Sequence, residues 1–106
     1  MPKFMFRGSY TATGAAGVLK DGGSGRRKAV EALAASLGGS IDAFYWAMGA
    51  DDFYLTVDLP DTKAAAALSM TVGASGSVTI TTAELFSAAD VDEIVARRAT
   101  YRAPGA

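Results

Sequence analysis

Four segments that alternate polar and apolar residues, separated by segments with helical spacing, constrain the fold of this chain more than any other feature. Alternation is typical of strands that bury one face, and apolar residues three and four positions apart are typical of helices that bury one side. The expected strands are residues 3–10, 40–48, 52–59 and 77–85. The expected helices span residues 13–20, 24–37 and 61–73, with a last helix after Ser87.

The order of these segments, β-α-β-β-α-β with one further helix, predicts an α+β domain of the ferredoxin-like type. Right-handed crossovers put both crossover helices on one face of a four-stranded antiparallel sheet. We expect residues 1–106 to form a single domain, with its core over about residues 2–95 and a C-terminal helix and tail after residue 87.

The other face of the sheet is expected to lack a helical cover. In the third strand Phe53, Leu55 and Val57 point toward the helices, whereas Tyr54 points the other way and Met5 of the first strand joins it. Two such sheets can pack across a two-fold axis and form an eight-stranded α/β barrel. We therefore expect a homodimer, or a higher homo-oligomer, built through the sheet face.

The amino-acid composition excludes several classes of functional site and of partner. The chain has no histidine and no cysteine, which excludes disulfides, thiolate zinc sites and His-based catalytic triads. Ten cations and eleven anions give a net charge of −1, so no electrostatic force draws the chain to nucleic acid. No apolar run is long enough to span a membrane, and the first residues do not read as a signal peptide. We expect a cytoplasmic protein with no membrane partner, no metal and no cofactor.

A glycine-rich joint followed by cations separates the first two helices: Leu19-Lys20-Asp21-Gly22-Gly23-Ser24-Gly25-Arg26-Arg27-Lys28. If Ser24 caps the second helix, N–H groups and cations gather at its start and favour a carboxylate or phosphate. Lys20 and Arg27 would hold that anion, and Tyr10 would donate a hydrogen bond to it. The spacing is not that of a P-loop. Alternatively, the glycines only break the helix and the cations are solvated.

Aromatic and acidic residues flank the expected hairpin. Tyr45 and Trp46 either wall a ligand cavity or pack in the core or a dimer contact. Asp51 and Asp52 point to opposite sides of a strand, so they do not readily share a proton. Asp52 either accepts from the backbone of the turn or serves as a base.

Several short segments together resemble one family: Ser9-Tyr10-Thr11 with Gly14, Leu19-Lys20-x-Gly22-Gly23-Ser24-x-x-Arg27, Leu37-Gly38-Gly39, Ala43-Phe44-Tyr45, Gly49-x-x-Asp52, Leu59-Pro60-Asp61 and Thr81-Thr82-x-Glu84-Leu85. Their order and spacing are similar to those of the GYD-domain proteins of the dimeric α/β-barrel superfamily. The resemblance implies the fold and the dimer, and it implies no particular reaction. The chain departs from the family at Asp51, which stands at the position of the name-giving tyrosine.

The favoured function is the binding of a small molecule in a cavity between sheet and helices, where Lys20 and Arg27 would hold an anionic group. A cofactor-free isomerase or monooxygenase-like enzyme, of the type found in related barrels, is one alternative, and a structural or regulatory subunit without a ligand is another. No residue is assigned a catalytic role. The candidate ligand-binding residues are Tyr10, Lys20, Arg27, Tyr45, Trp46, Asp52 and Tyr54.

Overall fold

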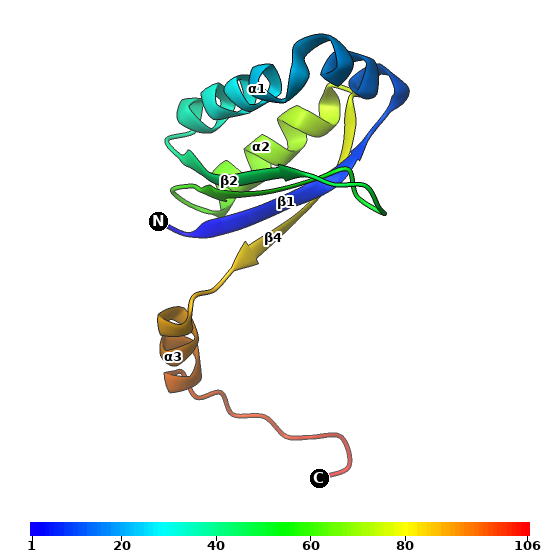
Figure 1. Ribbon diagram of the computed structural model, residues 1–106. Helices are drawn as coiled ribbons and strands as arrows, with labels where there is room; N and C mark the ends of the chain where they lie inside the picture. Colours follow the sequence, from blue (N-terminus) through cyan, green and yellow to red (C-terminus); the bar gives the residue numbers. More distant parts are fainter.

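The computed structural model describes residues 1–106 and has the predicted order of elements. These are β1 (Lys3–Tyr10), α1 (Ala12–Ser36), β2 (Ser40–Trp46), β3 (Phe53–Asp58), α2 (Thr62–Ala74), β4 (Val78–Leu85) and α3 (Ala88–Ala96). The strands form one sheet in the order β2-β3-β1-β4, and each neighbouring pair is antiparallel. Since α1 and α2 lie on the same face of this sheet (Figure 1), the predicted ferredoxin-like fold is confirmed.

The hydrophobic core lies between the sheet and these two helices. Alternate residues of β1 and β3 enter it, as their period of two predicts. Helix α2 contributes Ala65 and Leu68, and α1 contributes Ala34. The ten buried core residues are Phe4, Phe6, Ala34, Phe44, Phe53, Leu55, Val57, Leu59, Ala65 and Leu68.

Two glycines allow the backbone of β4 to approach its neighbours closely. A Cβ atom on Gly8 of β1 would collide with the carbonyl of Thr79, and one on Gly14 of α1 would collide with the carbonyl of Ser77. The side chain of Thr11 caps α1 by accepting from the Gly14 N–H. The start of α1 is thereby held against the start of β4.

Helix α1 bends at Gly22, which confirms the predicted break in the glycine-rich joint. Gly22 has φ 71° and ψ 173°, a backbone conformation that is essentially restricted to glycine. The helical segments before and after it form one bent element above the sheet (Figure 1).

The sheet face opposite α1 and α2 carries no helix, and we call it the open face (Figure 1). Cross-strand register brings Tyr54 of β3 opposite both Arg7 of β1 and Tyr45 of β2. The open face also carries small and hydroxyl side chains of β4. Its residues include Lys3, Met5, Arg7, Tyr45, Tyr54, Thr56, Thr79, Thr81 and Ala83.

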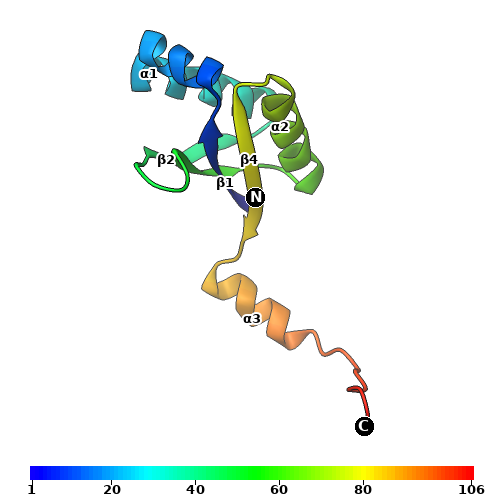
Figure 2. The ribbon, with the colours of Figure 1, turned by 90° about the vertical axis from the view of Figure 1, so that its right-hand side faces the viewer.

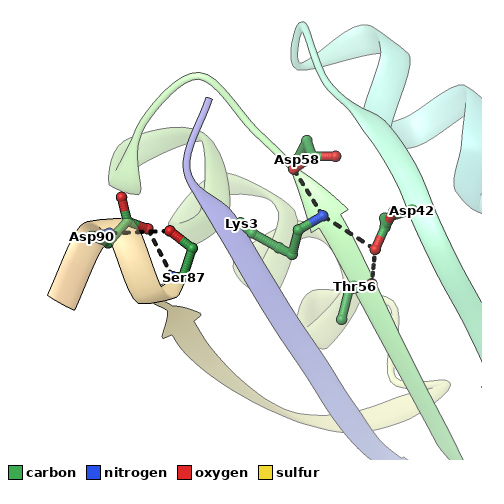
Figure 3. Close-up of polar contacts among 6 residues, drawn as sticks. All are labelled: Lys3, Asp42, Thr56, Asp58, Ser87 and Asp90. Carbon is green, nitrogen blue, oxygen red and sulfur yellow. Dashed lines mark hydrogen bonds and ion pairs between the residues drawn. The ribbon is translucent and has the colours of Figure 1, made fainter. Parts of the chain in front are cut away.

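Helix α3 lies away from the sheet, beyond the end of β4 (Figure 2). A capping box begins this helix: Ser87 Oγ accepts from the Asp90 N–H at 3.1 Å, and the Asp90 carboxylate accepts from the Ser87 N–H at 2.9 Å (Figure 3). None of the helices combines the length and apolar character that crossing a membrane requires.

Candidate functional site

A recess lies between α1, α2 and the sheet, and it has two adjoining parts. The outer part has a volume of about 330 Å³ and a polar lining that includes Thr13, Thr71 and Ser75. The inner part has a volume of about 110 Å³, and twelve of its thirteen lining residues are hydrophobic. We call both parts together the helix–sheet cavity, since they share the lining residues Tyr10, Arg26, Val72 and Val78.

Arg26 is the single charged residue in the lining of the helix–sheet cavity. Its Nη1 lies 3.7 Å from Asp21 Oδ2, and both side chains are partly exposed to solvent. An exposed pair at that separation contributes little free energy. The Arg26 guanidinium therefore remains available to an anion that enters the cavity.

Tyr10 and Trp46 form an aromatic wall, of which Tyr10 lines the helix–sheet cavity together with Arg26. Trp46 Nε1 donates to the Tyr10 hydroxyl at 2.9 Å, so the hydroxyl keeps its own hydrogen for another acceptor. The Trp46 ring stacks on Phe44 at 4.2 Å between centroids, and the Tyr10 ring lies 5.3 Å from that of Phe53. The core thus orients both rings.

The glycine-rich joint lies over this wall. A Cβ atom added to Gly23 would meet the Trp46 ring at 3.8 Å, which is ordinary van der Waals distance. Since Gly22 bends the chain one residue earlier, the joint passes close to the indole and the following turn carries Arg26 to the cavity. The joint therefore positions the cavity's cation.

Two aspartates connect the loop between β2 and β3 to β1 through hydrogen bonds and an ion pair. Asp52 Oδ2 accepts from the Tyr10 N–H at 2.9 Å, and the Asp52 N–H donates to the Gly8 carbonyl at 2.7 Å. Asp51 pairs with Arg7 at 2.7 Å, and this hydrogen bond raises the pKa of the guanidinium. Asp52 thus fixes the strand end that carries Tyr10.

Lys3 forms a second charged cluster on the open face (Figure 3). Its Nζ lies 3.1 Å from both Asp42 Oδ2 and Asp58 Oδ1, and Thr56 Oγ1 donates to Asp42 at 3.0 Å. Hydrogen bonds from Lys3 and Thr56 hold the pKa of Asp42 below its ordinary value, and the bonds to Asp42 and Asp58 raise the pKa of Lys3. The cluster links three strands.

The seven sequence-predicted candidates fall into three groups. Tyr10 lines the helix–sheet cavity, and Trp46 and Asp52 form hydrogen bonds to Tyr10 without lining the cavity themselves. Tyr45 and Tyr54 form a cross-strand pair on the open face. Lys20 is exposed and lines neither part of the cavity, while Arg27 pairs with Glu31 at 2.9 Å along α1.

The sequence places Arg26 among the cations of the glycine-rich joint, but Arg26 is not among the seven candidate ligand-binding residues. The signal is its spacing: Arg26 lies four residues before Val30 and seven before Leu33, on the stripe that α1 turns toward the sheet. Arg27, one residue on, is rotated by about 100° around the helix axis and lines neither part of the cavity. A cation on the apolar stripe of a helix therefore indicates a charge that faces the sheet.

Comparison with known proteins agrees with this architecture. No curated protein and no solved structure matches the chain. The sequence profile of the GYD domain family matches residues 4–95, which span all four strands and both crossover helices. The chain therefore belongs to the GYD domain family.

Proposed function

We propose that this protein binds a small molecule with an apolar body and an anionic group in the helix–sheet cavity. The observation that carries the proposal is the position of Arg26, where a polar outer part meets an apolar inner part. The two parts together have a volume within the range of small-ligand pockets, roughly 300 to 1,000 Å³. An amphipathic acid matches both linings.

Each part of such a ligand has a counterpart in the cavity. A hydrocarbon body entering the inner part leaves water, which contributes about 0.8 kcal/mol for each buried CH₂ group. A carboxylate at the junction accepts charge-assisted hydrogen bonds from Arg26 and one from the Tyr10 hydroxyl. Trp46 orients the Tyr10 hydroxyl by donating to it, and Asp52 keeps Tyr10 in position through the backbone.

Trp46 provides a direct measurement, because it is the single tryptophan of the chain and touches Tyr10. Titration with octanoate should change its fluorescence saturably, whereas acetate, which lacks the hydrocarbon body, should not. Arg26→Gln should weaken octanoate binding by about ten- to hundredfold, the loss expected for one charged hydrogen bond. The affinity of the variant for the neutral analogue 1-octanol should stay unchanged.

Arg27→Gln is the matched control, since Arg27 pairs with Glu31 outside the cavity. It should bind octanoate as the unmodified protein does. Equal octanoate affinities of the Arg26 and Arg27 variants would show that another cation holds the anion. No saturable response to octanoate or octanol would refute ligand binding of this class.

We further propose that the protein acts as a homodimer joined through the open face. Met5 is half-buried, and Tyr45 and Tyr54 are exposed on a sheet surface without a helical cover. Aromatic residues and methionine are enriched where protein surfaces meet. The ion pairs of Lys3 and Arg7 are satisfied within one chain, so a second sheet can cover them without leaving a lone charge.

A further inference from the structure

Helix α3 leaves most of its apolar side uncovered by its own chain, and of that side only Ile94 lines a hollow, which it shares with Met1, Pro2 and Leu85. Val91, Ile94 and Val95 form a stripe at helical spacing, and 44 to 55% of each residue's surface is exposed. No hydrogen bond or ion pair links α3 to the sheet or to the other helices. Phe86, which leads into α3, is exposed as well.

A helix of this length needs a surface on which to pack. Isolated helices shorter than about 12 to 15 residues are marginal in water, and α3 has nine residues. The capping box contributes on the order of 1 kcal/mol, which does not replace tertiary contacts. The apolar stripe supplies those contacts only when another surface covers it.

The exposed area of the whole chain shows how much surface α3 and the tail after it leave uncovered. The surface is 7055 Å² for a mass of 10.8 kDa, whereas a compact monomer of this mass exposes about 5,500 Å². The excess, on the order of 1,500 Å², exceeds the roughly 800 Å² that each partner buries in a standard interface. The radius of gyration is 16.8 Å against about 13 Å for a compact chain of this length.

The charges of the C-terminal segment complement those of an identical copy. Its acidic residues, Asp90, Asp92 and Glu93, lie in α3, whereas Arg97, Arg98 and Arg102 follow the helix. Two such segments running in opposite directions bring the acidic part of each beside the basic part of the other. This pattern favours a second copy of the chain over a partner with one sign of charge.

We propose that α3 is an intermolecular arm whose Val91, Ile94 and Val95 pack on a second copy of this chain. The inference rests on the proposed homodimer and goes beyond it, because it adds a contact outside the open face. In the assembly the surface of the second copy covers the apolar stripe of α3. Each copy thus contacts the other through its own α3.

Cross-linking between isotopically labelled copies tests the arm directly. The chain has no cysteine, so Ile94→Cys introduces a single thiol into the full-length protein. Light and heavy Ile94→Cys protein are mixed, allowed to exchange, and treated with a thiol–amine cross-linker that reaches lysines. Peptides joining residue 94 of one isotope to a lysine of the other are expected. Their absence, or links within one isotope alone, overturns the arm.

Two charge variants separate the arm from the open face. Ile94→Glu should weaken self-association measured by sedimentation at least tenfold. Ala89→Glu, on the opposite side of α3, should leave it unchanged. A dimer that is broken by Tyr54→Glu and keeps full affinity in Ile94→Glu would overturn the arm and leave the proposed dimer standing. A monomer at all concentrations would refute both.

Discussion

Lys3 is the residue that ties three strands together on the open face. It lies on β1 and reaches Asp58 on β3 and Asp42 on β2, so its ion pairs run across the sheet. Side chains this exposed are screened by water and salt, and such pairs contribute modestly to stability. Their effect is therefore best detected through its dependence on pH.

Asp42→Asn should destabilise the protein only within a defined pH window. The pKa of Asp42 is lowered from 3.8 in the folded state, so its contribution is present above that pH and is lost as pH falls through the folded value. The pKa of Lys3 is raised from 10.5, so its contribution is present below that pH and is lost as pH rises through the folded value. Urea unfolding at several pH values should show the difference at pH 7 and its loss in acid.

Glu84→Gln is the control for this experiment, since Glu84 is exposed on β4, outside α3, and belongs to no ion pair. It should leave the urea midpoint unchanged at every pH. An Asp42→Asn effect of the same size in acid and at neutral pH would mean that packing, and not the ion pairs, is disturbed.

The bend in α1 decides, at the scale of elements, where the cavity's cation lies. A straight helix cannot pass through the backbone conformation of Gly22, and the residues after the bend take a new direction over the sheet. Gly23 then passes near the Trp46 ring, which a Cβ atom at this position would meet at 3.8 Å, and Arg26 reaches the cavity. One backbone conformation therefore connects the glycine-rich joint to the site.

Two glycine substitutions in α1 should have opposite effects on stability. Gly22→Ala should lower the free energy of unfolding by about 1 to 3 kcal/mol, the cost of holding a non-glycine residue in a sparsely populated conformation. Gly17→Ala should raise it by about 0.4 to 1 kcal/mol, because Gly17 is helical and its Cβ would meet no atom within 4 Å. Urea unfolding followed by circular dichroism gives both values. Equal stability of the two variants would contradict the assigned role of the bend.

At the scale of the whole molecule, one chain exposes two surfaces that a globular monomer would ordinarily cover. The open face carries Tyr45 and Tyr54, and α3 carries an apolar stripe beyond the end of the sheet. Only 12 of the 106 residues are buried, so the core of a single chain is small. Self-association adds buried apolar area, and it makes stability depend on concentration.

Sedimentation equilibrium at micromolar concentration should therefore give the mass of two chains, and the thermal midpoint should rise with protein concentration. The double variant Tyr45→Glu, Tyr54→Glu should weaken the dimer at least tenfold, because two charges would be buried at the interface. Ala66→Glu, on the exposed side of α2, should leave the mass unchanged. A monomeric mass that persists to hundreds of micromolar would contradict the dimer.

The sequence predicted most of the fold because the relevant signals are local. Strand alternation identifies the buried faces of β1 and β3, and the capping pair Ser87 and Asp90 identifies the start of α3. The glycine-rich joint also predicts the break that the structure has at Gly22. Hydrophobic periodicity, capping side chains and helix-breaking glycines each involve only a few neighbouring residues, so they can be recognised in the sequence.

The candidate site depended on long-range geometry, and only part of it was predictable. Tyr10, Trp46 and Asp52 are all candidates from the sequence, but the hydrogen bonds of Trp46 and Asp52 to Tyr10 depend on the sheet order, in which β3 lies between β1 and β2. The choice of Arg26 over Arg27 or Lys20 follows from how α1 is rotated after its bend. The sequence alone thus determined the elements, their order and their buried faces. The tertiary structure decided which cation faces the cavity and which apolar surfaces are left uncovered, because both depend on the packing of segments that are distant in the chain.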